Sequence, residues 1–329
     1  MFTPVHTTLG ALLLYQSSSG LLLHNGAVFG ISSLLSDSIH RPSRDNVPII
    51  AGLMSSVVPV WLLAPSLIPS YPAAPFDLAS GAATFGVGVL LGWGTKNGRG
   101  CTSGHMLCGL SRLSVRSMIA TALFFTTALV TANISGGSGI PPCATGPCYN
   151  SIYPSVAELS FMIGAVLFSS ITNLIVVPKV LPRSETSRTL FSYLAGLEFG
   201  VGLFITGMAD PAKVSRFFAF LTDISRFDPS LALIIVFGIG PSLVTYLLNS
   251  PGKIGGKEKP GKKPTLAEKW RIPSTTVADI DGRFVAGAVA FGIAWGLRGV
   301  CPGPAILRSI LQPTWGLVTM SGYFLGGMF

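Results

Sequence analysis

Two similar stretches contain the residues with the most distinctive chemistry in this sequence. The first reads WGTKNGRGC over residues 93–101, and the second reads WGLRGVCPGP over residues 295–304. Each stretch places a cysteine, Cys101 or Cys301, after a tryptophan–glycine pair, a basic residue and a glycine. A single glycine-rich turn with one cysteine is more often a feature of helix packing. Two copies in the two halves of one chain favour a paired functional site instead.

The first motif predicts a loop that leads into the N-terminus of a short helix. Gly100 and Gly104 free the backbone for a tight turn and for close approach to a ligand. Thr102 and Ser103 follow the cysteine directly, and both residue types favour the first position of a helix. The unpaired N–H groups and the dipole at such a helix N-terminus attract anions. We therefore expect a thiol beside an anion-binding turn.

The second motif reaches the same geometry with different residues. Pro302 suits a first helical turn, and Gly303 loosens the backbone beside it. A sulfur-bearing anion could place its oxygen atoms on N–H groups and its sulfur against a polarisable thiol. A basic residue near each cysteine adds positive charge. The predicted substrate-binding or pathway residues are Cys101, Cys301, Thr102, Ser103, Gly104, His105, Gly100, Gly303, Arg99, Arg298 and Cys108.

The other cysteines and the histidine of the first motif have alternative interpretations. Cys108 lies two helical turns after Cys101 and either shares its face or packs in the core. His105 either binds substrate and responds to pH or makes a structural hydrogen bond. Cys143 and Cys148 belong to a predicted outer loop, where an oxidising exterior would allow a local disulfide.

Two acidic residues also fall within apolar stretches. Asp210 precedes Pro211 in GMADPAKV, and we expect its carboxylate to cap a short helix there. Glu198 lies inside the apolar window 190–208. It is either a buried acid or a partner of another helix, and the sequence leaves its role open.

The composition predicts an all-α polytopic membrane protein. Of the 329 residues, 49% are hydrophobic and only 11% are charged, whereas soluble domains have about 25% charged residues. Apolar windows long enough to cross a bilayer recur along the whole chain. The net charge of +9 therefore indicates basic membrane loops rather than a nucleic-acid partner.

The apolar windows predict about nine transmembrane helices. Three segments between them, residues 101–112, 211–221 and 301–311, are apolar but too short to span. We interpret these segments as re-entrant half-helices, because irregular backbone at membrane depth must be buried or line a cavity. The nine windows are 9–35, 47–69, 79–97, 115–133, 155–177, 190–208, 230–248, 282–298 and 313–329.

The basic residues predict the orientation of the chain and an internal repeat. Seventeen of the 22 lysines and arginines fall on the side of the odd-numbered loops. The positive-inside rule then places these loops in the cytosol and the N-terminus outside. The two cysteine motifs enter from opposite faces, as an inverted repeat requires. The predicted units are a first repeat (1–140), a connector (141–189) and a second repeat (190–329).

The lysine-rich stretch 250–281 is the most polar part of the chain. Lysine, glycine and proline dominate its first half. Such a composition is typical of a flexible linker, and we place it in the cytosol.

Several stretches resemble the YeeE/YedE family of sulfur transport membrane proteins. They include GRGCTSGHMLCGLSRLSVRS, GIAWGLRGVCPGPAI, NGAVFGISSLL (25–35) and GMADPAKV (207–214). The resemblance covers most of residues 20–329 and implies inward transport of thiosulfate past cysteines at half-helix tips. It also implies a cytosolic sulfur-carrier partner and a plasma-membrane location. Members of the family carry a third pathway cysteine where this sequence has GAVFGISSLL, so Ser32 or Ser33 would replace it.

Two other classes of function compete with transport. A membrane sulfurtransferase would use the thiolate of Cys101 as a nucleophile, although the sequence offers no separate base or donor domain. A redox-sensing membrane protein would use the cysteines as switches. A second cysteine motif on the opposite face favours passage across the bilayer. The sequence shows no nucleotide-binding loop or metal-ligand cluster, so we expect no enzyme activity, cofactor or metal.

Overall fold

The computed structural model describes residues 1–74, 77–134, 140–144, 146–249, 263–273 and 277–329. Their secondary structure is helical apart from two isolated β-bridges, which confirms the all-α class. The α-helices of the first half are α1 (Pro4–Asn25), α2 (Ile31–His40), α3 (Val47–Ser55), α4 (Val57–Leu63), α5 (Leu78–Asn97) and α6 (Val115–Ile134). They continue with α7 (Val156–Ile171), α8 (Glu185–Thr206), α9 (Pro211–Phe217), α10 (Gly240–Asn249), α11 (Gly282–Arg298), α12 (Pro302–Leu311) and α13 (Pro313–Gly326).

Short 3₁₀ and π-helical segments join or extend these helices. Three of them are π-helices, in which the hydrogen bonds run over five residues instead of four. The π-helices are η2 (Ser103–Gly109), η4 (Thr172–Val180) and η8 (Ile235–Ile239). The 3₁₀ segments are η1 (Pro65–Leu67), η3 (Leu110–Arg112), η5 (Phe218–Leu221), η6 (Ile224–Arg226), η7 (Pro229–Ala232) and η9 (Val277–Asp279).

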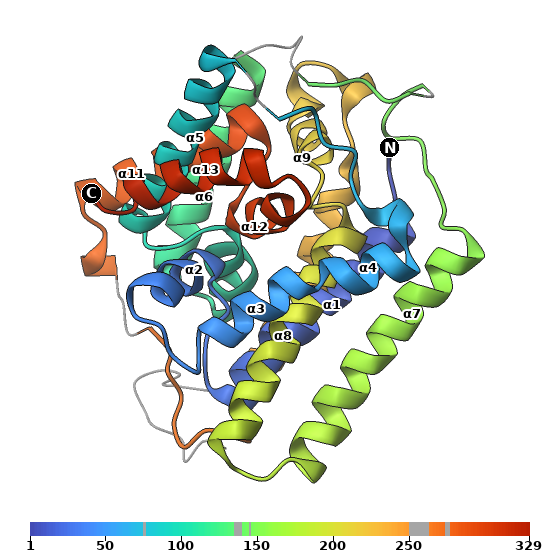
Figure 1. The fold of residues 1–329 in the computed structure, drawn as a ribbon, viewed down its shortest axis with the longest axis vertical. Helices are drawn as coiled ribbons and strands as arrows, with labels where there is room; N and C mark the ends of the chain where they lie inside the picture. The colour runs from blue at the N-terminus through green and yellow to red at the C-terminus, as the bar shows by residue number, and fades with distance from the viewer. Residues whose placement is uncertain (75–76, 135–139, 145, 250–262, 274–276) are drawn as a thin grey trace.

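The long helices form two bundles, and each bundle takes helices from both halves of the sequence (Figure 1). In one bundle α8 packs against α1 and α3, with α7 along its edge. In the other, α5 packs against α11 and α13, and α11 also packs against α6. The short helices α2 and α12 contact α3 of the first bundle, and they contact α5 and α13, respectively, of the second. The two sequence halves therefore interlock, and the short helices lie where the bundles meet.

The polytopic membrane character is confirmed, but fewer helices than nine are long and apolar enough to span. In the described part of the chain five meet both criteria, or six if the bent pair α11–α12 counts as one span. The bend between α11 and α12 is 42°. The window 47–69 divides into the short helices α3 and α4, and the window 9–35 ends within α2. Breaks of this kind are tolerated at membrane depth where other helices cover them.

The three predicted half-helices are all short helices in the structure. Residues 101–112 contain η2 and η3, residues 211–221 contain α9 and η5, and residues 301–311 contain α12. The Asp210 carboxylate accepts a hydrogen bond from the Ala212 backbone N–H, so the predicted N-terminal cap of α9 is confirmed.

Part of the predicted flexible linker is ordered against the bundle. The backbone N–H groups of Thr265 and Leu266 donate to carbonyls of Leu23 and His24 at the end of α1. The Arg271 N–H donates to the Gly26 carbonyl, and Leu266 is buried. Apolar residues inside the polar stretch explain the difference, because burying them offsets the entropy of ordering the chain. Residues 250–262 and 274–276 lie outside the described part.

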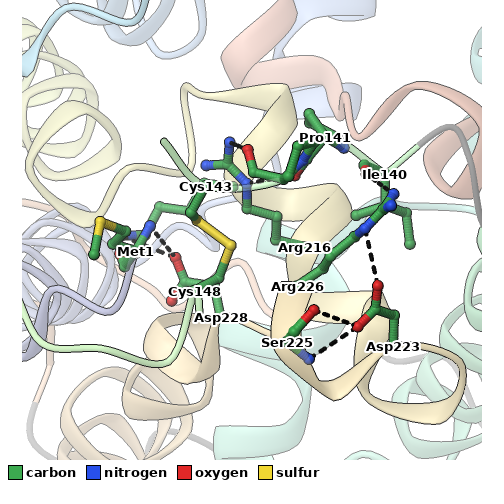
Figure 2. Close-up of a disulfide and its surroundings, with 12 residues drawn as sticks. Met1, Ile140, Pro141, Cys143, Cys148, Arg216, Asp223, Ser225, Arg226 and Asp228 are labelled. Atoms are coloured by element: carbon green, nitrogen blue, oxygen red, sulfur yellow. Dashed lines mark hydrogen bonds and ion pairs between the residues drawn. A yellow bond between two sulfur atoms is a disulfide. The ribbon is translucent and has the colours of Figure 1, made fainter. Parts of the chain in front are cut away.

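Cys143 and Cys148 form a disulfide at the end of the molecule that carries the N-terminus (Figure 2). The Phe2 N–H donates to the Cys148 carbonyl, and the Cys148 N–H donates to the Ser225 carbonyl. Burial lowers the pKa of the Met1 amino group, although Asp228 lies 3.4 Å from it. The local disulfide anticipated from the sequence is therefore present, and backbone hydrogen bonds of Cys148 link its loop to the N-terminal segment and to η6.

Candidate functional site

The two motif cysteines line one cavity of about 110 Å³. The exposed fractions of Cys101 and Cys301 are 1% and 4%, and both are free thiols. Thr102 and Ser103 from the first motif and Gly303 from the second also line the cavity. The structure thus brings together two sequence motifs that are separated by most of the chain.

The cavity lies at the N-terminal ends of three short helices, α2, η2 and α12. The Ile31 N–H at the start of α2 donates to the Ser103 hydroxyl at 3.1 Å. The same hydroxyl lies 3.2 Å from the Cys101 sulfur. Cys301 occupies the position before the first residue of α12, and its side chain does not cap that helix. Each thiol is therefore close to a helix N-terminus, where an anion is favoured.

Most of the remaining cavity wall is apolar. Its residues come from both bundles and from the turn before α9, and include Leu14, Met106, Phe125, Phe199, Leu203, Met208, Leu231, Ile239 and Trp295. Of these, Met106, Met208 and Trp295 lie in stretches quoted in the sequence analysis, where they were not singled out; the others sit at ordinary apolar positions of helices. Sequence reasoning missed them because an apolar residue has the same pattern whether it packs in a core or lines a cavity.

Thr102 lies near both thiols. It lines the same cavity as Cys301. The Thr102 residue itself is adjacent to Cys101 in sequence and is buried. The hydroxyls of Thr102 and Ser103 therefore face the two sulfurs, and they can donate to a bound anion in the same space.

Two larger cavities flank the central one. The first, of about 620 Å³, contains Arg298, Arg308 and Asp210 and includes Val300, the residue before Cys301. The second, of about 350 Å³, contains Gly100, the residue before Cys101. It is lined by four arginines, Arg99, Arg112, Arg116 and Arg271. In each motif, consecutive residues thus line a basic cavity and the central thiol cavity.

Arg99 and Arg298 lie in these flanking cavities rather than beside the thiols. The Arg99 guanidinium is 3.9 Å from Asp279 and 3.8 Å from Asp281. Arg298 is exposed. Within the described residues, no charged side chain lines the central cavity, so its polarity comes from hydroxyl, thiol and backbone groups.

His105 holds the first turn in place. Its Nε2 lies 3.0 Å from the Gly98 carbonyl and its Nδ1 lies 3.1 Å from the Ser117 hydroxyl. Because a carbonyl only accepts, Nε2 carries the proton and Nδ1 accepts from Ser117. His105 lines the basic cavity of about 350 Å³ and not the thiol cavity. This geometry matches the structural hydrogen-bonding alternative.

Gly100 is required by this turn, whereas Gly104 and Gly303 are less constrained. The Gly100 φ angle is +156°, and a Cβ there would lie 2.6 Å from His105 Nε2. A Cβ at Gly104 would be no closer than 3.8 Å to any neighbour. At Gly303 a Cβ would meet the flexible end of Ile31 at 2.8 Å.

Cys108 lies outside the central cavity. Its sulfur donates to the Phe29 carbonyl at 3.4 Å. It lines a separate cavity of about 20 Å³ with Ser18, Ser19 and Ser111 among others. A thiol bonded to a backbone carbonyl in so small a space fits the packing alternative.

Comparison with known proteins places the chain among transporters. A family of unknown function, DUF6691, matches residues 188–328. A protein of Xylella fastidiosa strain Temecula1 with the name "Probable transporter" is 35% identical over 130 residues, which are 39% of this chain and 92% of that protein. The chain belongs to the family of these probable transporters. A second such protein of the same strain is 37% identical over 122 residues, which are 37% of this chain and 74% of that protein.

This membership agrees with the fold. A chain with several apolar spanning helices and transporter relatives is a multi-pass membrane protein of a transporter family. Strain 9a5c of the same species also has a "Probable transporter" that is 35% identical over 130 residues, or 92% of its length. Each match accounts for well under half of this chain.

Proposed function

We propose that this protein transports thiosulfate or a related small sulfur-containing anion through the central thiol cavity. The observation that carries the proposal is the meeting of Cys101 and Cys301 in one cavity. Two larger cavities lined by arginines flank it. Arginines at both mouths attract an anion, and the central stretch selects among anions.

The lining of the central cavity favours a soft anion over a strongly hydrated one. An anion that enters must exchange water for thiol, hydroxyl and backbone donors, because the rest of the wall is apolar. Losing water without replacement bonds is costly for every oxygen atom. A terminal sulfur is less strongly hydrated and makes favourable contacts with polarisable thiols. Thiosulfate therefore fits better than sulfate.

The position of the third family cysteine is occupied here by Ser32 and its neighbours. Ser32 is buried, and its hydroxyl oxygen has no hydrogen-bond partner. Ser33 is exposed and lines the basic cavity of about 350 Å³. We therefore propose a path with two thiols, in which the serine hydroxyls of α2 offer hydrogen bonds to the anion in place of a third thiol.

The proposed orientation follows the distribution of charge. The Lys- and Arg-rich segments around residues 45, 188 and 271 meet at one end of the molecule through Asp45. The N-terminus and the disulfide lie together at the other end. The positive-inside rule assigns the first end to the cytosol, and a disulfide suits the oxidising exterior of a plasma membrane. The larger cavity with Arg298 would then receive the anion from outside.

Uptake of radiolabelled thiosulfate into proteoliposomes tests this function. We expect Cys101→Ala and Cys301→Ala each to lower uptake at least about tenfold, since a hydrogen bond to a charged group contributes about 1.5–3 kcal/mol. The matched control is Cys108→Ala, which removes a buried thiol outside the cavity and should keep uptake within about twofold. Excess sulfate should not compete.

Retained uptake in the Cys101→Ala, Cys301→Ala double variant would refute the thiol path. Sulfur transfer, the other hypothesis from the sequence, gains no observation of its own. Among the described residues, the thiols contact hydroxyl groups but no general base, and His105 is engaged with Gly98 and Ser117.

A further inference from the structure

Glu198 is a buried acid that the proposed path does not use. It lies in the middle of α8, and 3% of its surface is exposed. One carboxyl oxygen accepts a hydrogen bond from the Ser169 hydroxyl at 2.8 Å. The other oxygen, Oε1, is buried and has no hydrogen-bond partner. No lysine, arginine or histidine of the described residues forms an ion pair with Glu198.

These surroundings favour the neutral carboxyl group. A carboxylate without a cation is expensive to bury in an apolar medium. A carboxyl group with one donor and one unpaired oxygen keeps a proton at much lower cost. Ionisable residues within membrane helices commonly mark the route of an ion or a proton.

A series of polar side chains leads from Glu198 to one end of the bundle. The Asn173 side-chain amide of η4 donates to the Ser169 hydroxyl at 3.4 Å, and that hydroxyl donates to Glu198. The His24 ring lies near Asn173, whose side-chain oxygen has no hydrogen-bond partner. His24 Nδ1 is 2.9 Å from the Thr265 hydroxyl, and Thr265 is partly exposed. This end is the one proposed to face the cytosol.

The local backbone explains why Asn173 and His24 lie close together. Residues 172–180 form a π-helix, and π-helical turns loosen the regular hydrogen-bond pattern and leave backbone groups available to side chains. The Asn173 carbonyl is thereby accessible to His24. Gly20 allows the close approach, because a Cβ there would lie 2.0 Å from the Asn173 side-chain oxygen.

The interface of α8 with α1 and α7, which we call the seam, is closed by packing in the opposite direction, toward the N-terminal end of α1. A Cβ at Gly10 of α1 would lie 2.7 Å from Thr206 of α8, so these helices are in direct contact there. Met162 of α7 is fully buried. In this conformation the series from Glu198 therefore leads toward the end that carries Thr265.

Other titratable groups on the elements packed against α8 are farther along the seam or on its surface. On α1 and α7, His6 and Glu158 form a pair with each other 3.9 Å apart at the N-terminal end. On α1, Tyr15 bonds to Thr245; Lys179 lies at the end of η4, and Arg308 of α12 lines the outer basic cavity. Helices α3 and α4 contain no charged residue. His24 is thus the titratable group that faces Glu198, through Asn173.

Glu198 is also adjacent to a residue that lines the thiol cavity. The next residue, Phe199, lines that cavity and stacks on Phe29 with ring centroids 4.3 Å apart. Phe29 precedes α2, whose first residue, Ile31, lies against the cavity as well. A shift of α8 that accompanies a change at Glu198 would therefore move the cavity wall.

We propose that Glu198 is the binding site for a proton that enters together with the anion. This inference rests on the proposed function. Glu198 takes a proton in the outward-facing state and releases it through Asn173 and His24 to the cytosol. One proton moves inward in each cycle; an O–H bond forms and breaks at Glu198, and N–H bonds form and break as the proton passes the His24 ring. Proton entry would offset part of the charge that an anion carries against an inside-negative potential.

Proteoliposomes containing the full chain and a pH-sensitive dye inside test the proposal. Thiosulfate added outside should acidify the interior of wild-type vesicles. An inward proton gradient of one pH unit should raise accumulation by up to about tenfold, the largest concentration ratio that a single coupled proton supports at that gradient. Glu198→Gln keeps the shape and the hydrogen bonds of the neutral acid. This variant should exchange labelled for unlabelled thiosulfate at a rate near wild type, without acidification and without a response to the gradient.

Glu158→Gln is the matched control, since it makes the same change at the outer end of the seam, and it should behave as wild type. Exchange without any acidification in wild-type vesicles would overturn the proton proposal and leave the transport function intact. A gradient response that persists in Glu198→Gln would overturn it as well. Absence of exchange in the folded wild type would instead refute the proposed function. If Glu198→Gln did not fold, the wild-type acidification assay alone would decide.

Discussion

At the scale of single residues, the first motif depends on the packing of His105 against Gly100 and on the hydrogen bonds of the histidine, which together we call the lock. His105 holds the Gly98 carbonyl and the Ser117 hydroxyl. Its ring lies directly over Gly100, where a Cβ would be 2.6 Å from Nε2. The lock fixes the backbone that carries Cys101. The histidine thus acts on the thiol cavity through the position of the turn.

Replacing Gly100 by alanine should destabilise the protein. A side chain at this φ angle of +156° costs about 1–3 kcal/mol in backbone strain, and the clash with His105 costs about 1–3 kcal/mol more. We expect a thermal midpoint in detergent several degrees below wild type. Gly104→Ala is the control, because a Cβ there would make only ordinary van der Waals contact with Gly30 at 3.8 Å, and its midpoint should change little. Equal midpoints for the two variants would contradict this account of the turn.

At the scale of elements, the second bundle depends on close contact between α5 and α13. A Cβ at Gly92 of α5 would lie 1.9 Å from the Tyr323 carbonyl oxygen, and one at Gly326 of α13 would lie 2.1 Å from the Val89 carbonyl oxygen. Small residues on both faces let the helix backbones touch, which is the usual source of helix association in lipid. Gly86 lies on the same helix but has no neighbour within 4 Å.

This contrast predicts different effects for one substitution at two sites on α5. Gly92→Ala should lower the free energy of unfolding by about 1–3 kcal/mol, because the added methyl group forces the helices apart. Gly86→Ala should be neutral or stabilising by up to about 1 kcal/mol, since alanine favours helix. Denaturation of both variants in the same detergent checks the difference. A larger loss at Gly86 than at Gly92 would show that the two helices are not packed as described.

The ordered part of the linker, residues 263–273, is a second element held by specific contacts. Asp45 lies between Arg188 and Arg271, with N···O distances of 2.6 and 2.5 Å. Burial by itself raises the pKa of Asp45, but the hydrogen bond and charge of Arg271, together with Arg188, hold this pKa below its usual value. The ionised form therefore stabilises the docked segment. That contribution is present above the ordinary pKa of aspartate and is lost as the pH falls through the lower folded-state value.

Asp45→Asn should loosen the docked segment without unfolding the protein. Hydrogen exchange of residues 263–273 should be faster at pH 7, and the global stability should change by no more than about 1 kcal/mol, since the pair is partly exposed and screened. Asp37→Asn is the control. Asp37 and Asp45 both line the basic cavity of about 350 Å³, but Asp37 forms no ion pair among the described residues. Unchanged exchange in Asp45→Asn would mean that backbone bonds alone hold the segment.

At the scale of the whole molecule, fixed charge is concentrated at the two mouths of the proposed path. A dianion that enters a cell at about −100 mV works against about 2.3 kcal/mol per charge. The arginines raise the local concentration of anions but do not supply this energy. Net accumulation therefore requires a coupled ion or rapid consumption inside, which gives the buried acid Glu198 its proposed importance.

The orientation of the whole molecule can be tested with the native cysteines. Cys101, Cys108 and Cys301 are buried, whereas Cys143 is partly exposed in the disulfide-bonded loop. In intact cells treated with a membrane-impermeant reductant, the thiols released from this disulfide should react with an impermeant maleimide. The double variant Cys143→Ser, Cys148→Ser should abolish this labelling of the protein. Labelling that appears only after the membrane is permeabilised would reverse the assigned orientation.

The sequence by itself determined the membrane class and the short interrupted helices, and it singled out the two cysteine motifs. Apolar composition decides the class because a chain with so few charges cannot cover a water-exposed surface. Glycine and proline decide the interruptions because they act on the local backbone. The Asp210 cap of α9 was predictable for the same reason, since its partner is two residues away.

Only the tertiary structure decided which residues meet. Cys101 and Cys301 share a cavity because each bundle takes helices from both halves, and no local pattern encodes that interlocking. Arg99 and Arg298 are near the cysteines in sequence, yet the turns direct them into separate cavities. The neighbours of Glu198 come from α7, and its connection to His24 depends on a π-helix. Contacts between distant segments are set by how helices pack, which depends on side chains that apolar periodicity alone does not distinguish.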